Sequence, residues 1–391
     1  MTIADLRFSM IGVTRIQTFI DQEGRRSSAA SAYLTTDVCR RKNLKISVGM
    51  TVTRIITQPG PNGTPIAKGV EFASGAHAPL RYRVRAKRDV IISAGSVHTP
   101  HLLKLSGIGP KDELAQHGIK LVKDLPGVGH NLQDHLLVPM TVNCAKGKGA
   151  NYVPKPLIRL GLFVQWLLFG WGPLGSNFIE AACWIRSSDD PDMVGTVEDL
   201  ASSPNEPDME IMSLPIFYDD MGKTLVSDTD AGHWTLLQLP LRPSSVGSIT
   251  LSSNNPFTAP LIHANYFSTE NDRKLSVWAF KKCCEIFKAS GEFVSWYKPL
   301  RADELTDDEI LSYLKDTANT CNHPVGSAKL DREEKCGVVS NRLKVHGVEN
   351  LRVCDASIIP RVPSGHPCAP VIGVAERFAD MLKEEYAMLK Y

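Results

Sequence analysis

The chain has 391 residues, of which 43% are hydrophobic and 22% are charged, and its formal net charge is +2. This length and composition are those of a globular protein of roughly two or three domains, and they exclude an extended disordered chain. The balanced charge, without a basic stripe interleaved with aromatic side chains, gives no reason to expect nucleic acid as a partner.

The first regular structure is expected over residues 43–94, where alternating and β-branched residues stand between turn signals. This pattern predicts a β-meander that leads into a buried strand at 90–93. Two short helices follow. The first is expected to begin at Thr99 and Pro100 and to end at Gly107, and the second to span 111–118.

The most apolar run covers residues 156–175 and is interrupted by Arg159 and Gln165. It is too short for a clean membrane span, which needs ~20 apolar residues, so it predicts a buried or lid-forming helix. Further on, an amphipathic helix is expected over 272–290 and a final helix over 369–390. The N-terminus lacks a basic region followed by an apolar core, so no secretory signal is expected in this chain.

The pattern divides the chain into three parts, 1–138, 139–320 and 321–391. We expect an α+β fold, in which the middle part holds an antiparallel sheet with helices and the third part returns to the fold of the first. The nine cysteines show no C-x-x-C pair and no metal-ligand spacing. They predict free, mostly buried thiols and no metal site.

The glycine-rich segment 106–135 raises the question of a nucleotide-binding loop. A dinucleotide fingerprint needs G-x-G-x-x-G between a strand and a helix, but in 127–132 the last position is Leu132 instead of glycine. The one literal match in the sequence is 170–175, where Pro173 and a preceding helical run favour a turn after a helix. We therefore expect neither segment to hold a phosphate.

Six separated blocks occur in a characteristic order. They are GRRSSAASAYL, AGSVHTPHLLKLSGIGP, DLPGVGHNLQDH, NHPVGSAKL, GVENLRVCDASIIP and GHPCAPVIGVAERFADML. Together they resemble the middle and closing sections of the glucose-methanol-choline (GMC) oxidoreductases, flavoenzymes that oxidise alcohols. The resemblance extends over nearly the whole chain.

The resemblance implies a GMC-like α+β fold with an incomplete Rossmann part. Residues 1–138 would be a flavin-domain portion, 139–320 a substrate-binding domain, and 321–391 the return to the flavin domain. Members of the family begin with a strand, glycine loop and helix that bind the ADP half of FAD, and this sequence starts after that point. FAD binding by this chain alone is therefore expected to be weak. A fragment, an incomplete gene model and a natural protein without that unit all remain open.

Oxidation of an alcohol needs a base for the hydroxyl proton and an acceptor for hydride, tasks that suit histidine and flavin. The resemblance implies that His323 in NHPVGS and His366 in SGHPCAP hold the substrate oxygen in front of the flavin. His130 and His135 are expected to be structural or cofactor-adjacent.

The resemblance also implies cofactor contacts at five positions. Asp355 and Ala356 match the turn that approaches the FAD pyrophosphate and ribityl chain. Pro367 and Val371 match the start of a helix that points at the flavin ring, where N–H groups would stabilise negative charge. Val52 matches a strand position that meets the adenine, although a β-branched residue in a strand needs no such role.

These observations lead to the expectation of an FAD-dependent oxidoreductase that acts on CH–OH groups of a small-molecule alcohol. Two alternatives remain, namely an FAD-containing non-redox lyase that cleaves cyanohydrins and a catalytically inactive family member. No membrane span is expected. A homo-oligomer is possible, because exposed strand edges and apolar faces promote association.

Overall fold

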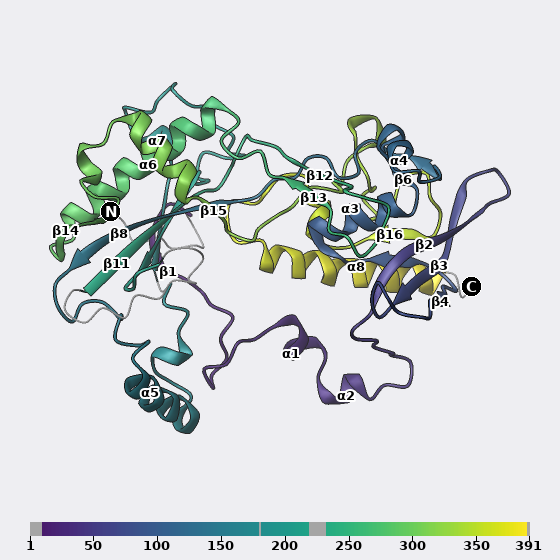
Figure 1. Ribbon diagram of the computed structural model, residues 1–391, viewed down its shortest axis with the longest axis horizontal. Helices are drawn as coiled ribbons and strands as arrows, with labels where there is room; N and C mark the ends of the chain where they lie inside the picture. Colours follow the sequence, from purple (N-terminus) through teal and green to yellow (C-terminus); the bar gives the residue numbers. More distant parts are fainter. Residues whose placement is uncertain (1–9, 180, 219–231, 389–391) are drawn as a thin grey trace. The chain divides into compact units, whose positions relative to one another are not determined.

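The computed structural model describes residues 10–179, 181–218 and 232–388. The chain forms two compact units, and it passes between them several times (Figure 1). The first unit comprises residues 1–41, 135–244 and 267–321, and the second comprises 42–134, 245–266 and 322–391. The predicted boundaries at 138 and 320 lie close to two of these transitions. The segments 1–41 and 245–266, however, belong to the opposite unit from the one predicted.

An antiparallel sheet organises the first unit, in the order β1-β9-β10-β11-β8-β14, with β15 also paired to β8. The strands are β1 (Gly12–Arg15), β8 (Leu136–Cys144), β9 (Ala181–Ile185), β10 (Met209–Leu214), β11 (Gly232–Pro240), β14 (Phe293–Lys298) and β15 (Asn319–Thr320). Strand β8 is buried along almost its whole length, and β11 supplies Leu237 and Leu239 to the core. The antiparallel sheet predicted for the middle part is therefore present.

Helix α6 (Glu270–Ala289) is the predicted amphipathic helix of this unit. It begins at Thr269, whose side chain accepts the N–H of Asp272, and its buried face includes Phe280, Cys283 and Phe287. This spacing of three to four residues matches the helical period. The other helical elements are α1 (Ala29–Tyr33), α2 (Thr36–Cys39), α5 (Pro156–Phe169), α7 (Asp307–Thr317), η1 (Pro173–Gly175), η2 (Ser187–Asp189) and η4 (Ala302–Glu304).

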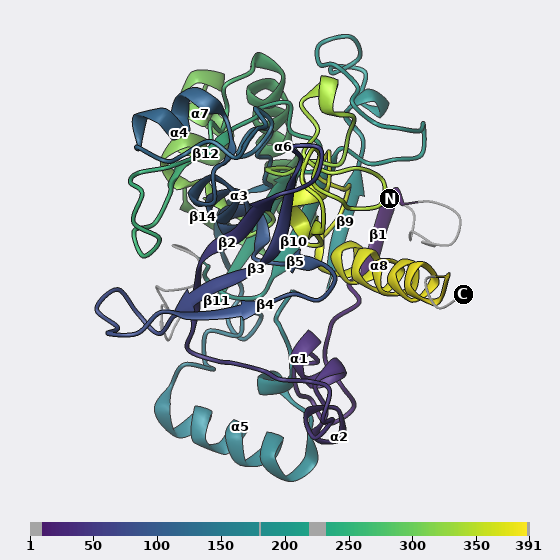
Figure 2. The ribbon, with the colours of Figure 1, turned by 90° about the vertical axis from the view of Figure 1, so that its right-hand side faces the viewer.

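Helix α5 lies apart from the sheet of its unit (Figures 1 and 2). None of its residues is buried, and Leu157, Leu167 and Leu168 are 86%, 64% and 67% exposed. The side chain that faces inward is partly polar, since Trp166 donates its indole N–H to the carbonyl of Gly24 at 2.9 Å. Of the two predicted alternatives, a buried helix is therefore wrong, while a lid-forming helix stays a prediction.

Residues 170–175 form the turn that the sequence predicts. Gly170 ends α5 in the left-handed conformation (φ 67°), and the 3-10 helix η1 follows directly. The literal glycine motif therefore lies at the end of an α-helix. It does not precede an α-helix whose N-terminus could bind a phosphate. Within the described ranges, no helix is long and apolar enough to cross a membrane.

The second unit carries the predicted meander, in which β2 (Thr51–Pro59), β3 (Pro65–Ala73) and β4 (Tyr82–Arg85) pair in sequence order (Figure 2). Strand β5 (Val90–Ile92) runs parallel to β16 (Leu351–Val353). Val90 and Ile92 are buried while Ile91 is 43% exposed, so one face of β5 forms the core. Two short pairs complete the unit, β6 (Ile108–Gly109) with β7 (Lys123–Asp124) and β12 (Ser248–Thr250) with β13 (Leu261–His263).

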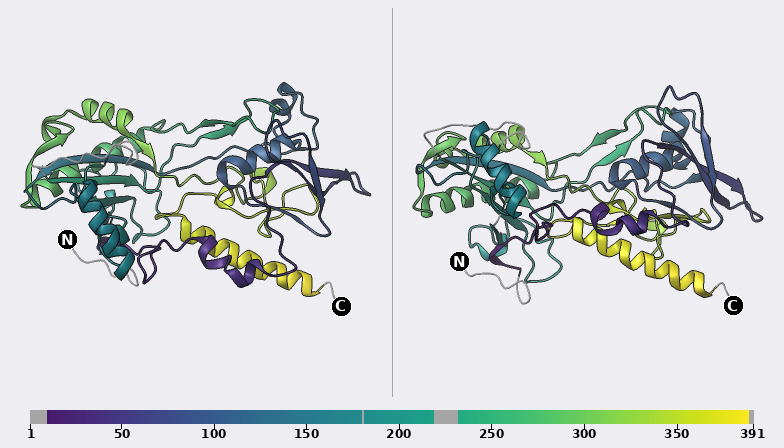
Figure 3. Two further views of the ribbon diagram at one scale, coloured as in Figure 1. Left: turned by 60° about the horizontal axis from the view of Figure 1, so that its bottom comes forward. Right: turned by 90° about the horizontal axis from the view of Figure 1, so that it is seen from below.

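The helices of the second unit are α3 (Gly95–Leu105), α4 (Lys111–Gln116), η5 (Glu333–Lys335), η6 (Ala356–Ile358) and α8 (Cys368–Met388), the last being one continuous helix (Figure 3). Helix α3 begins earlier than predicted, so Pro100 lies inside it. Proline cannot donate to the carbonyl four residues before it. That carbonyl, of Ser96, instead accepts the hydroxyl of Ser327 at 2.5 Å.

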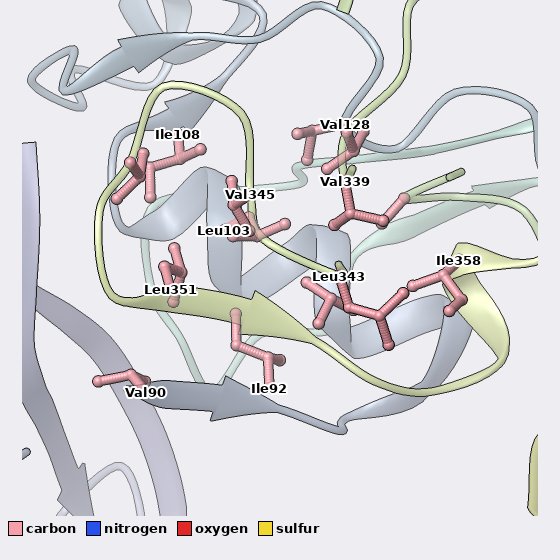
Figure 4. Packing of buried hydrophobic residues seen from close by; sticks show 14 of the residues in the cluster. Val90, Ile92, Leu103, Ile108, Val128, Val339, Leu343, Val345, Leu351 and Ile358 are labelled. Carbon is pink, nitrogen blue, oxygen red and sulfur yellow. The ribbon is translucent and has the colours of Figure 1, made fainter. Parts of the chain in front are cut away.

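One buried cluster joins β5, β16, α3 and the loops beside them (Figure 4). Its labelled members are Val90, Ile92, Leu103, Ile108, Val128, Val339, Leu343, Val345, Leu351 and Ile358. Residues from 90–128 and from 339–358 interleave in it, which explains why the end of the chain returns to the fold of its beginning. All nine cysteines are free, and five of them are buried, as predicted.

Arg352 ties this core to the last turns of α8. Its guanidinium donates to Asp89 at 2.7 Å and to both carboxylate oxygens of Glu385 at 2.9 Å, and its side chain is only 2% exposed. Tyr386 donates to the same Asp89 carboxylate, and burial together with Asp89 raises the pKa of Tyr386 to about 12. The end of α8 is therefore held by a buried ionic network.

Replacing Arg352 by methionine is expected to lower the free energy of unfolding by about 3–5 kcal/mol, because it leaves two carboxylates without their buried partner. Urea unfolding followed by circular dichroism measures this change. Lys383→Met, which removes an exposed ion pair with Asp380 on the same helix, serves as the control and should leave the unfolding midpoint nearly unchanged. Equal midpoints for the two variants would contradict the prediction.

Candidate active site

The structure brings the two predicted histidines together in the second unit. His323 lies in the loop that follows β15, and His366 lies two residues before the start of α8. Their Nε2 and Nδ1 atoms, respectively, are 3.2 Å apart, and the rings meet at 86° with centroids 4.7 Å apart. His323 is half-buried and His366 is exposed, so the pair is open to a ligand on one side.

A 3.2 Å contact between two ring nitrogens requires one N–H donor and one lone pair. These are the two functions that a hydroxyl group needs, because it can donate to the lone pair and accept from the N–H. An alcohol oxygen bound at about 2.8 Å from each nitrogen would take the place of this contact, and the two rings would have to move apart to admit it. The pair can then hold the oxygen through one imidazole and accept its proton at the other.

The loop of His323 is anchored by the segment 131–134. Gln133 and Val325 exchange both of their main-chain hydrogen bonds, at 3.1 and 2.8 Å. Asn131 donates its amide to the carbonyl of Gly326 at 3.3 Å. The main chain of Gln133 and the side chain of Asn131 therefore hold the loop two and three residues after the histidine.

The same segment also holds the chain that leads to His366. The amide of Gln133 donates to the carbonyl of Pro360 at 3.0 Å and accepts the N–H of Val362 at 3.3 Å. Asn131 donates to the same Pro360 carbonyl at 3.0 Å. One short segment thus orients both histidine-bearing loops.

The glycines before this segment allow close packing of main chains. A Cβ atom on Gly127 would lie 2.1 Å from the carbonyl oxygen of Cys336, and one on Gly129 would lie 2.3 Å from that of Ile249. Gly129 also has a φ of 83°, which favours glycine. This confirms that the glycine-rich segment is a packing element and forms no phosphate loop.

The remaining histidines of this segment differ in environment. His135 is fully buried and its Nε2 contacts the carbonyl of Leu241 at 3.0 Å, so it is a structural residue of the first unit. His130 is exposed and lies beside a polar hollow of the second unit.

The first turn of α8 begins immediately after His366. Pro367 is buried and Val371 donates its N–H to the carbonyl of Pro367 at 2.9 Å. A helix start leaves its first N–H groups without helical partners, and here these belong to Cys368 and Ala369, since Pro370 has none. Any donation from α8 to a flavin would therefore come from Cys368 and Ala369, because the N–H of Val371 is already engaged.

Asp355 and Ala356 lie at the end of β16, where η6 begins. One carboxylate oxygen of Asp355 accepts the N–H of Gly95 at 2.9 Å and the hydroxyl of Thr99 at 2.5 Å. The other accepts the N–H and hydroxyl of Ser357. Because these donors fill the four lone-pair positions of the carboxylate, a cofactor contact at Asp355 and Ala356 would use the main chain.

Val52 lines a hollow of about 780 Å³ that lies beside the meander, β5 and α3, all in the second unit. Val52 is 38% exposed and belongs to β2. The buried His101 also lines the hollow, and burial, with smaller contributions from His98 and Lys104, lowers its pKa to about 4. His101 is therefore uncharged at neutral pH, and the hollow is also lined by Arg85, Asp89 and apolar side chains.

The donors at the start of α8 and the hollow beside Val52 fit two parts of an FAD molecule, its flavin ring and its adenine. The structure does not bring all five predicted cofactor positions together, since Val52 lies at the hollow and the other four lie near the histidines or η6. The sequence prediction missed Asn131 and Gln133 as individual residues. The NLQD pattern was the signal for them, because amides in a loop often bond to main chains.

The site thus consists of a histidine pair beside a helix N-terminus, an arrangement that is chemically able to bind a hydroxyl group. Two sequence models described as GMC oxidoreductase match the chain, one at residues 8–137 and the other at 243–375. The chain belongs to the GMC oxidoreductase family. The match at 8–137 shows that the family's N-terminal part is represented in the chain.

The relatives are dehydrogenases and oxidases. Dehydrogenase str4 of Strobilurus tenacellus is 35% identical over 407 residues, covering 95% of this chain and 64% of its own length. Human mitochondrial choline dehydrogenase is 34% identical over 374 residues, covering 94% of this chain and 58% of its own. The chain therefore spans less than two thirds of the length of these curated relatives.

Solved structures share the fold. A formate oxidase of Aspergillus oryzae superimposes with a TM-score of 0.84 at 30% identity, covering 97% of this chain and 66% of its own. A fungal aryl-alcohol oxidase gives a TM-score of 0.80 at 26% identity, covering 97% and 67%. These similarities confirm the predicted GMC-like α+β fold.

Proposed function

We propose that the complete protein is an FAD-dependent oxidoreductase that acts on the CH–OH group of a small-molecule alcohol. The observation that carries the proposal is the 3.2 Å contact between His323 and His366 at the start of α8. One imidazole accepts the hydroxyl proton, while the other holds the same oxygen by donating a hydrogen bond. Both tasks use atoms that already face each other.

FAD, when bound, supplies the acceptor for the hydride that leaves the carbinol carbon. We propose that the main chain of Asp355 and Ala356, the N–H groups at the start of α8 next to Pro367 and Val371, and the strand at Val52 contact this cofactor. Choline dehydrogenases and a fungal aryl-alcohol oxidase are among the proteins that this chain resembles. The proposal accordingly names a class of substrate, compounds with a CH–OH group, and does not name a particular alcohol.

The test uses protein expressed from the full-length transcript and loaded with FAD. Mixed with a panel of alcohols without oxygen, it should lose its flavin absorbance with at least one of them. A lyase that cleaves cyanohydrins would release an aldehyde and cyanide with no change in absorbance, and the comparisons give no support to this alternative. Absorbance that persists with every alcohol would favour the inactive family member and contradict the proposal.

We further infer that the 391-residue chain associates with itself through α5. Five apolar residues, Leu157, Leu160, Val164, Leu167 and Leu168, follow the helical period on its outer side and are 44% to 86% exposed. Such a stripe is larger than the scattered apolar residues of ordinary surfaces, and its burial would favour association. A homo-oligomer follows if two copies cover each other's helix.

The double variant Leu160→Glu and Leu167→Glu is expected to shift the chain towards monomer, because two charges in the stripe would be buried unpaired in the associated state. Light scattering over a range of concentrations measures the shift. Leu80→Glu changes a leucine that is 59% exposed in the second unit and should have no effect. A monomeric parent chain would contradict the inference.

A further inference from the structure

We propose that Asp134 is a positioning residue for His323, and that Tyr266 fixes the carboxylate of Asp134 in turn. The inference rests on the proposed function, because it assigns a role in orienting the proposed catalytic pair. Asp134 accepts the main-chain N–H of His323 at 2.9 Å through Oδ1 and the hydroxyl of Tyr266 at 2.6 Å through Oδ2. All three residues belong to the second unit.

The carboxylate is placed for this task by its burial. Asp134 is only 9% exposed, and Tyr266 is half-buried. Burying a carboxylate is unfavourable unless its oxygens accept hydrogen bonds. Loss of either hydrogen bond would therefore raise the free energy of the folded chain. The partners of the two oxygens come from different segments of the chain. His323 lies in the loop after β15 and Tyr266 lies after β13, so Asp134 links these two segments.

The main chain around both partners adopts conformations that must be held from outside. Asn322, directly before His323, has a φ of 59°, and Asn265 and Phe267, on either side of Tyr266, have φ values of 57° and 55°. Such a conformation is unfavourable for a residue other than glycine and persists only where surrounding contacts over-determine it. A phenylalanine with positive φ is particularly unfavourable. The contacts of Asp134 are among those that hold these conformations.

Removal of the Asp134 carboxylate is expected to affect the conformation of His323 and its immediate neighbours only. The next anchor of the loop is the main-chain exchange between Gln133 and Val325, two residues further on. Loss of the Asp134 carboxylate would leave that anchor in place and release residues 322–324. The ring of His323 would then lose its fixed direction towards Nδ1 of His366, although the loop remains attached.

The kinetic test compares Asp134→Ala, Asp134→Asn and Tyr266→Phe in the full-length, FAD-loaded protein. Asp134→Ala is expected to lower kcat ~10–100-fold with KM and flavin content retained, because small displacements of a reacting group have effects of this size. Asparagine keeps an oxygen for the His323 N–H and an amide for the Tyr266 oxygen, so Asp134→Asn should recover kcat to within about threefold of the parent. Tyr266→Phe should give an intermediate loss.

A control separates positioning from general destabilisation. Asp208 is another buried carboxylate, which accepts the N–H and hydroxyl of Ser187 in the first unit. Asp208→Ala should lower the melting temperature with little change in kcat. If Asp208→Ala lowered kcat as much as Asp134→Ala, or if Asp134→Asn were as slow as Asp134→Ala, the positioning role would be overturned.

A second measurement does not depend on turnover. In the 391-residue chain labelled with 13C-histidine, the ring signals of His323, identified by their absence in His323→Gln, should shift or broaden in Asp134→Ala and stay in place in Asp134→Asn. The signals of the buried His101 should not change. If the parent protein oxidises no alcohol, the proposed function fails while this spectrum still decides the positioning. Unchanged His323 signals in Asp134→Ala would overturn the inference.

Discussion

Replacing His366 by alanine in the full-length, FAD-loaded protein is expected to lower kcat by a factor of about 10²–10⁴, the usual contribution of a positioned acid–base group. The exposed imidazole of His366 contacts His323 through Nδ1 at 3.2 Å. Its removal leaves the substrate oxygen with one nitrogen instead of two. Because the lost interaction belongs to the transition state, kcat should fall far more than FAD binding.

Stopped-flow reduction of the flavin by the alcohol measures this loss directly. His366→Asn separates the two roles of the pair, since an amide can hold the oxygen but cannot take its proton. Substantial turnover in His366→Asn with none in His323→Asn would assign the base to His323. His77→Ala alters an exposed histidine of the same unit and serves as the matched control. A full-speed His366→Ala enzyme would refute the assignment of the pair.

The 391-residue chain expressed by itself is expected to bind FAD with a Kd weaker than about 1 µM, so that the cofactor is lost on gel filtration. Tight binding of a dinucleotide uses a glycine loop and helix N-terminus that hold the pyrophosphate. Within the described residues, no strand is followed by a G-x-G-x-x-G loop and a helix. The start of α8 and the hollow beside Val52 would contact only the two ends of the molecule.

Absorbance spectra of the purified chain, before and after incubation with excess FAD and gel filtration, give the result. The product of the full-length transcript, treated in the same way, shows whether any residues that it adds to the 391 raise the affinity for FAD. A yellow 391-residue chain with one FAD per molecule would show that the described residues suffice. In that case the pyrophosphate contact would have to be sought near Asp355 and Ala356.

Much of the local structure could be predicted from the sequence. The meander β2–β4, the short helix α4, the amphipathic α6 and the final helix α8 were all expected from turn signals and hydrophobic periodicity. The formation of these elements depends on residues that are neighbours in the sequence, so their helix and strand preferences can be read from the sequence directly. The pairing of His323 with His366 was likewise predicted, although it came from the resemblance to the GMC family and the residues alone could not supply it.

The structural predictions that were wrong share one cause, which is contact between residues that lie far apart in the sequence. Helix α3 begins early because Asp355, 260 residues away, accepts the N–H of Gly95. The segment 1–41 belongs with the antiparallel sheet because β1 pairs with β9, with Gly12 opposite Trp184. Neither partner leaves a signal in the local sequence. The same holds for α5, which has no buried residue although its apolar composition predicted a buried or lid-forming helix.

What the sequence by itself determined was the identity and order of the chemical groups: the histidines in their two blocks, the NLQD segment and the positions of turns and helices. Only the tertiary structure decided how these groups act together. It showed that Asn131 and Gln133 bind both histidine loops, that Asp134 bonds to His323, and that the carboxylate of Asp355 is already filled. The physical reason is that hydrogen bonds depend on distance and direction in space, and a side chain such as Asp134 has the same local sequence whether its oxygens face solvent or a histidine N–H.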